Sequence, residues 1–147
     1  MKKALFPTAQ DAEAAFYEAF TKSDLEAMMA VWADDDDIYC VHPNGARVTG
    51  VERVRESWRQ IFASSQTLRF QLREQQTVQG MMLSVHSVYE HVMVAGDPRS
   101  RAPVIATNVF LRTERGWCMV AHHASPAPAP ADAGGDPERR REQKTLH

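Results

Sequence analysis

Apolar residues recur at helical spacing in three segments of the first half of the chain. The stripes are Ala12, Phe16, Ala19 and Phe20; then Leu25, Met28, Met29 and Trp32; then Val51, Val54, Trp58, Ile61 and Phe62. Positions three or four residues apart share one face of a helix, so each stripe predicts an amphipathic helix. Thr8, Ser23 and Thr49 each precede an acidic residue by three positions, which is typical of a capping box.

The period changes from helical to alternating after Phe62. Leu68, Phe70 and Leu72 alternate with polar residues, which predicts a half-buried strand. Further strands are predicted in the run 81–95 and in a hairpin of 103–111 and 117–125, and a short one at 38–41 precedes the third helix. The helices are segregated before an antiparallel sheet, so the sequence predicts an α+β fold.

The composition predicts one domain followed by a tail. A chain of 147 residues with 44% hydrophobic content suits a single domain with a sizeable core. From Ser125 onward, prolines lie among alanine, glycine and charged residues, and Leu146 is the first large apolar side chain. We therefore expect a folded domain over residues 1–125 and a disordered tail over residues 126–147.

Charge and cysteine content narrow the expected partners. A net charge of −2 gives no general attraction to nucleic acid. No apolar run has the length of a membrane span or of a signal-peptide core, so we expect a cytoplasmic protein without a membrane partner. Cys40 and Cys118 stand far apart in apolar runs, which predicts two reduced, buried thiols.

The histidines predict neither a metal site nor a cofactor. His122 and His123 are adjacent on a predicted strand, so their side chains point to opposite faces. His86 and His91 also differ by an odd number and diverge. A zinc site needs three or four convergent ligands, and no spacing in the chain supplies them.

Two polar residues in apolar strands are candidates for chemistry. Glu90 is either a buried carboxylate with a raised pKa that acts as general acid or base, or a strand-end glutamate in water or paired with Arg69 or Arg73. Asn108 is the single amide of its strand, and it either positions a ligand or satisfies a backbone group at a bulge. His42 opens a turn near the expected site. Trp58 and Phe62 lie at helical spacing, where core packing is favoured over ligand stacking.

Several local strings resemble a known superfamily. They are Val41-His42-Pro43 with Gly45, Gly50, Ser57-Trp58, Ile61-Phe62, Glu90, Ala106 to Phe110, and Trp117 to Ser125. Over about residues 8 to 125 the chain resembles the cone-shaped α+β proteins that include ketosteroid isomerase, scytalone dehydratase and nuclear transport factor 2, and among them the SnoaL-like proteins of unassigned activity. The tyrosine and two acids of the steroid isomerases are not recognisable, because no aspartate lies in the four long strands.

The resemblance implies three helices packed on a curved antiparallel sheet, an internal pocket, and a homodimer formed through the outer face of the sheet. It also implies that Trp117, Met119, Ala121 and His123 face the cone and that His122 faces outward. The residues support the dimer independently, because the strand from Pro103 to Leu111 has one strongly polar side chain and so no solvated face.

Three functions therefore compete. The first is a homodimeric protein that binds a small, mostly apolar molecule at His42, Tyr39, Trp58, Phe62 and Asn108. The second is an isomerase, dehydratase or hydrolase in which Glu90 and His123 move protons while Tyr39 or Asn108 holds an oxyanion. The third is an oligomerisation module. The first is the function that the sequence favours.

Overall fold

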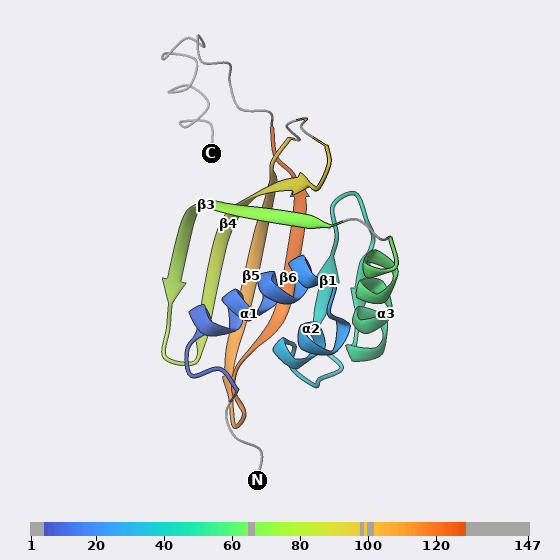
Figure 1. Cartoon of the computed structure of the whole chain (residues 1–147). Helices are drawn as coiled ribbons and strands as arrows, with labels where there is room; N and C mark the ends of the chain where they lie inside the picture. The colour runs from blue at the N-terminus through green and yellow to red at the C-terminus, as the bar shows by residue number, and fades with distance from the viewer. Residues whose placement is uncertain (1–4, 65–66, 98, 100–101, 129–147) are drawn as a thin grey trace.

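Three helices lie on one six-stranded sheet in the computed structural model, which describes residues 5–64, 67–97, 99 and 102–128 (Figure 1). The helices are α1 (Ala9–Lys22), α2 (Leu25–Val31) and α3 (Val51–Phe62). The strands are β1 (Tyr39–Val41), β2 (Arg47–Thr49), β3 (Leu68–Gln79), β4 (Leu83–Val94), β5 (Val104–Thr113) and β6 (Gly116–Pro126). This arrangement confirms the predicted α+β fold.

The strand order across the sheet is β2-β1-β6-β5-β4-β3. Neighbouring strands are antiparallel except for β1 and β6, which are parallel, so the sheet is mixed rather than wholly antiparallel. The four long strands form a meander, and α1 crosses one face of it, while α2 and α3 lie beside β1 (Figure 1). That helix-covered face is the inner face of the sheet.

The structure confirms one of the three predicted helix caps. The Thr8 hydroxyl accepts a hydrogen bond from the Asp11 amide at 3.0 Å, as predicted for the start of α1. Ser23 does not cap α2; it ends α1 in the left-handed region, and Asp24 caps α2 by accepting from the Ala27 amide. Gly50, not Thr49, occupies the N-cap of α3, without a side-chain hydrogen bond.

Large apolar side chains fill the space between the helices and the inner face. Phe16 of α1 contacts Trp58 of α3 edge to face, with ring centroids 5.5 Å apart. Phe110 and Met119 come from the sheet, and both are fully buried. Both cysteines are free and buried, as predicted. The core thus packs α1 against β3, β5 and β6.

Two bulges change the course and the facing of the strands. In β3 the register with β4 shifts between Arg73 and Gln76, Glu74 adopts a φ of 52°, and the strand bends sharply (Figure 1). In β6 the shift comes at Val120, because Met119 pairs with Phe110 and Ala121 pairs with the adjacent Val109. A bulge of one residue exchanges the faces of every side chain beyond it.

The structure describes only the first residues of the predicted tail, which was expected to begin at residue 126. β6 continues to Pro126, and the Ala127 amide donates to the Pro103 carbonyl at 2.9 Å. Most of the predicted tail, residues 129–147, lies outside the described residues. Among the helices of the described part of the chain, none has the length and apolar character needed to cross a membrane.

Candidate functional site

Asn108 is the centre of a buried polar cluster between α1 and the sheet. Its Nδ2 donates to Glu13 Oε2 at 3.1 Å and to the Tyr17 hydroxyl at 3.0 Å. Its Oδ1 lies 2.6 Å from His122 Nδ1. Since a carbonyl oxygen only accepts, His122 carries its proton on Nδ1 and donates it. These three partners fix the orientation of the amide.

Glu90 lies at one end of this cluster. The Tyr17 hydroxyl donates to Glu90 Oε2 at 2.6 Å, and the Glu90 side chain is 3% exposed. Burial raises the pKa of Glu90 to about 7; the hydrogen bond from Tyr17 opposes that shift, and the charge of Glu13 adds to it. Burial and the neighbouring Glu90 raise the pKa of Tyr17 far above its ordinary value. Glu90 therefore exchanges a proton near neutral pH, whereas Tyr17 stays protonated.

The other end of the cluster runs through Glu13 and His86 to Ser84. His86 Nδ1 lies 3.0 Å from Glu13 Oε2, and His86 Nε2 lies 2.8 Å from Ser84 Oγ. Ser84 donates to Gln79 Oε1, whose amide nitrogen donates to Gly80 O. The Ser84 hydrogen therefore points away from His86, and His86 Nε2 donates to Ser84. This order of donors does not prepare Ser84 as a nucleophile, which would have to donate to the histidine.

The two adjacent histidines face opposite to the prediction. His122 is buried at 1% exposure against Phe16 and Trp58, whereas His123 is exposed on the outer face of the sheet, paired in register with Thr107. Trp117 and Met119 do follow the predicted facing; the bulge at Val120 reverses the residues after it. Burial, with the nearby His42 and His123, lowers the pKa of His122 to about 3, so its imidazole is neutral. The predicted pairing of Glu90 with His123 is therefore wrong, because Glu90 is buried and His123 lies on the outer face.

The remaining predicted residues form a second group near β1 and α3, which meets the first where Trp58 packs beside His122. His42 Nε2 lies 3.1 Å from Ser57 Oγ, which itself donates to the Val54 carbonyl. The His42 ring stands edge to face on Trp58 at 4.7 Å, and burial lowers the pKa of His42. Trp58 and Phe62 pack against each other. Tyr39 does not join either group, since its side chain is exposed on β1.

Sequence reasoning missed Tyr17, Glu13 and the role of His86. Glu13 and Tyr17 are four residues apart on α1 and border the apolar stripe of Ala12 and Phe16, and their spacing on this face was the available signal. The lack of aspartate in the strands did not exclude a tyrosine with two acids, because α1 supplies the tyrosine and one of the glutamates. The described residues contain no group of three or more histidine, cysteine or acidic side chains placed to hold a metal ion.

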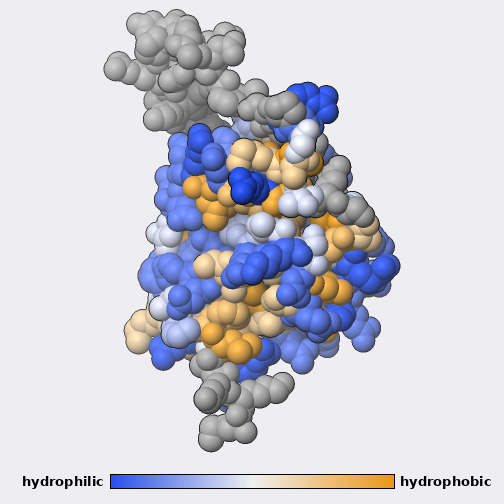
Figure 2. Space-filling model, viewed as in Figure 1, coloured by the Kyte–Doolittle hydropathy of each residue, from blue (hydrophilic) through white to orange (hydrophobic). Residues whose placement is uncertain are grey.

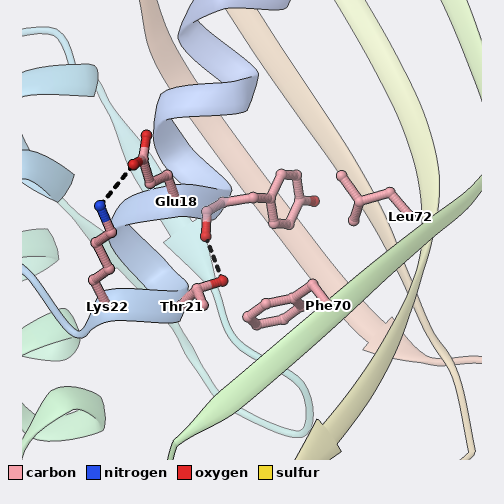
Figure 3. Close-up of a pocket in the computed structure, with 6 residues that line it drawn as sticks. Glu18, Thr21, Lys22, Phe70 and Leu72 are labelled. Carbon is pink, nitrogen blue, oxygen red and sulfur yellow. Dashed lines mark hydrogen bonds and ion pairs between the residues drawn. The ribbon is translucent and has the colours of Figure 1, made fainter.

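A pocket of about 280 Å³ opens between the last turns of α1 and β3. It is lined by Tyr17, Glu18, Thr21, Lys22, Phe70 and Leu72. Phe70 and Leu72 reach toward α1 from β3, while Glu18 and Lys22 pair with each other at 2.7 Å (Figure 3). Leu72 is the register partner of Glu90, so the β3 wall of the pocket lies beside the Tyr17–Glu90 pair. The surface on this side of the molecule mixes polar and apolar side chains (Figure 2).

Comparison with known proteins shows the family of this fold. The SnoaL-like domain family matches residues 10–130. A solved structure from Thiobacillus denitrificans, named as a candidate calcium/calmodulin-dependent protein kinase type II association domain, is 38% identical with a TM-score of 0.79, covering 83% of this chain and 97% of that one. A candidate dehydratase of the NTF2-like family from Streptomyces avermitilis is 31% identical with a TM-score of 0.73, covering 80% of this chain and 92% of that one.

A plant protein shares the same region. The F-box protein SKIP8 of Arabidopsis thaliana is 28% identical over 110 residues, which is 75% of this chain. The chain spans 46% of the length of that protein. The family match extends over most of the sequence, and two of the similar structures exceed 30% identity. The chain therefore belongs to the SnoaL-like family of the NTF2-like superfamily.

Proposed function

We propose that this protein is a homodimer that binds a small, mostly apolar molecule in the pocket between α1 and β3. The observation that carries the proposal is the combination of an aromatic and aliphatic wall, Phe70 and Leu72, with the Tyr17–Glu90 pair beside it. Ligand sites in proteins combine apolar side chains with placed polar groups, and this pocket combines Phe70, Leu72 and Tyr17 with three polar side chains of α1. This pocket departs from the predicted ligand site, since none of the residues predicted for it lines the pocket; these are His42, Tyr39, Trp58, Phe62 and Asn108.

A blocking substitution tests the pocket. Thr21 lines it from α1, so Thr21→Trp fills the space without touching the buried cluster. We expect a bound aromatic probe such as 2-naphthol to lose at least tenfold in affinity by calorimetry. The matched control is Thr49→Trp, an exposed position on β2 at the opposite edge of the sheet, which leaves the affinity unchanged. Equal affinities in the two variants contradict the proposed pocket.

The second candidate is an acid/base enzyme, and the pKa of Glu90 favours it. A carboxyl group with a pKa of about 7 is matched to proton transfer at neutral pH. In this candidate Glu90 moves the proton, Tyr17 orients it, and His123 has no part. One of the similar structures is named as a candidate dehydratase, which is an enzyme of this kind. Turnover that Glu90→Gln abolishes while ligand affinity stays within a few fold supports this candidate.

The homodimer rests on the outer face of the sheet. Val78, Val85 and Val109 lie side by side in register across β3, β4 and β5, and Leu83 lies opposite Leu111. Val78 is 72% exposed and Leu83 is 46% exposed. Contiguous exposed apolar side chains of this kind mark association surfaces. One of the similar structures is named as a candidate association domain, and its name supports an oligomerisation module as the alternative function of this chain.

Sedimentation equilibrium tests the dimer. We expect a dimer at micromolar concentration, and we expect Val109→Asp to give a folded monomer because it places a charge at the middle of the apolar row. Thr49→Asp, on the exposed edge strand β2, is the control and stays dimeric. A monomeric wild-type protein removes both the dimer and the oligomerisation module.

A further inference from the structure

His86 is a buried histidine of the polar cluster that has no part in the proposed functions. It lies on the inner face of β4, four residues before Glu90, and it is 2% exposed. Its ring packs on Phe110, with ring centroids 4.9 Å apart. Among the ion pairs of the described residues, the pair that reaches the cluster joins His86 to Glu13, and no lysine or arginine takes part. His86 is therefore the group placed to balance a charge on Glu13.

The hydrogen bonds of the ring locate two hydrogens. Ser84 gives its hydrogen to Gln79, so His86 Nε2 carries a hydrogen and donates it to Ser84. The other ring nitrogen, Nδ1, lies 3.0 Å from Glu13 Oε2. Two lone pairs would not face each other at this distance in a buried site, so a second hydrogen lies between these two atoms. Glu13 and His86 therefore share one proton, and the pair is neutral whichever member carries it.

Glu13 connects this pair to Glu90 through two side chains. Asn108 donates to Glu13 Oε2 at 3.1 Å and to the Tyr17 hydroxyl at 3.0 Å. Tyr17 in turn donates to Glu90 at 2.6 Å. The charge of Glu13 raises the pKa of Glu90. The proton shared with His86 limits that effect, because a neutral pair repels a second carboxylate less than a lone carboxylate does.

We infer that His86 is a positioning residue of the Glu90 site, which supplies the proton that neutralises Glu13 and so lets Glu90 exchange its own proton alone. The inference rests on the proposed acid/base role of Glu90, and it adds the residue that acts on Glu90 from a distance. His86 acts through Glu13, since its own hydrogen bonds reach Glu13 and Ser84 and not Glu90.

The other groups packed around Glu90 do not compete for its proton. Burial raises the pKa values of Tyr17 and Cys40, so both stay protonated near neutral pH. Burial lowers the pKa of His122 to about 3, so its imidazole is neutral there. The register partner of Glu90 on β3 is the apolar Leu72. Competition for the proton of Glu90 can therefore come from Glu13 when its own shared proton is taken away.

Titration of the Glu90 carboxyl carbon in the carbon-13-labelled full chain tests the inference. We expect one step, with a midpoint near 7, in the wild-type protein. In His86→Leu, two carboxyl groups compete within one buried site, so the curve should divide into two steps about one pH unit or more apart. The matched control is His91→Leu, which removes the histidine next to Glu90 on the outer face of the same strand and keeps the single step.

A second substitution identifies the competing group. Adding Glu13→Gln to His86→Leu removes the second carboxyl group, so the single step should return. If His86→Leu does not fold, His86→Asn replaces it, because an amide can donate to Glu13 but cannot take up a proton, and the same two steps are expected.

Two results would overturn the inference. One is a single step at the wild-type midpoint in the His86 variant, and the other is a pair of steps that persists in the double variant. A wild-type midpoint near 4.5 is a different failure, since it contradicts the proposed acid/base role of Glu90 itself.

Discussion

The inner and outer faces of strands β3 to β6 differ in how their side chains are partnered. On the inner face, the buried polar side chains of Ser84, His86, Glu90, Asn108 and His122 each have a hydrogen-bond partner within the fold. On the outer face, apolar side chains such as Val78 and Leu83 are exposed. The inner polarity is therefore completed by the chain itself, whereas the outer apolar rows form the surface of the proposed dimer.

The difference between the two faces indicates where a ligand and a partner subunit would bind. A buried polar group costs free energy unless it is paired, so a fold that needed only stability would have filled the inner face with apolar residues. The inner face instead keeps Glu90 and Asn108, which are hydrogen-bonded to Tyr17 and Glu13 of α1. We therefore assign the proposed assembly to the outer face and the proposed ligand to the inner face.

The largest effect is expected from a change at the centre of the inner cluster. Asn108→Leu keeps the side-chain size but leaves the His122 Nδ1 hydrogen without its partner and removes one hydrogen bond each from Glu13 and Tyr17. We therefore expect a loss of about 3–5 kcal/mol in the free energy of unfolding. Thr107→Val, the neighbouring residue on the outer face, changes it by about 0.5 kcal/mol or less. Urea denaturation of both variants measures the contrast, and similar small losses would show that the two faces do not differ.

A smaller effect, with a defined pH dependence, is expected at Glu90. Its pKa is raised in the folded state from 4.5 to about 7, so its contribution to stability is fully present below pH 4.5 and is lost as the pH rises to 7. The loss amounts to about 3 kcal/mol. Glu90→Gln cannot ionise, so relative to wild type it gains stability across this interval. Denaturation curves at pH 4.5, 6 and 7.5 measure the gain, with Glu52→Gln as a control that shows none.

The adjacent histidines give the smallest of the three contrasts. His122→Ala removes the donor to Asn108 and opens a space beside Phe16 and Trp58, for an expected loss of about 2 kcal/mol. His123→Ala, on the outer face, changes stability by about 0.5 kcal/mol or less. Equal effects of the two substitutions would contradict the facing that the bulge at Val120 produces.

Most of the fold could be predicted from periodicity. The three helices and four long strands follow from spacings of 3.6 and 2 residues, and the capping signal at Thr8 was sufficient to start α1. β2 was not predicted, because Arg47–Thr49 is too short to show a period. The parallel pairing of β1 with β6 also has no local signal, since it joins segments about 80 residues apart.

The site could be predicted only in part. Glu90 and Asn108 stand out because each is a polar residue in an apolar strand, and the structure places both in the buried cluster. The position of His122 depends on the bulge at Val120, and the pairing with β5 that defines the bulge is a tertiary property. Tyr17 and Glu13 were missed because their partners lie on strands more than 70 residues away.

Direct titration of the Glu90 side chain tests the central claim, that the inner face holds a buried carboxyl group poised near neutrality beside a ligand pocket. The measurement is the pH dependence of its carboxyl carbon chemical shift in carbon-13-labelled protein, assigned by comparison with Glu90→Gln. We predict a midpoint near 7, in accord with the pKa of about 7 that burial produces. A midpoint near 4.5, the ordinary value for a glutamate, would mean that Glu90 is solvated and that the buried cluster does not exist.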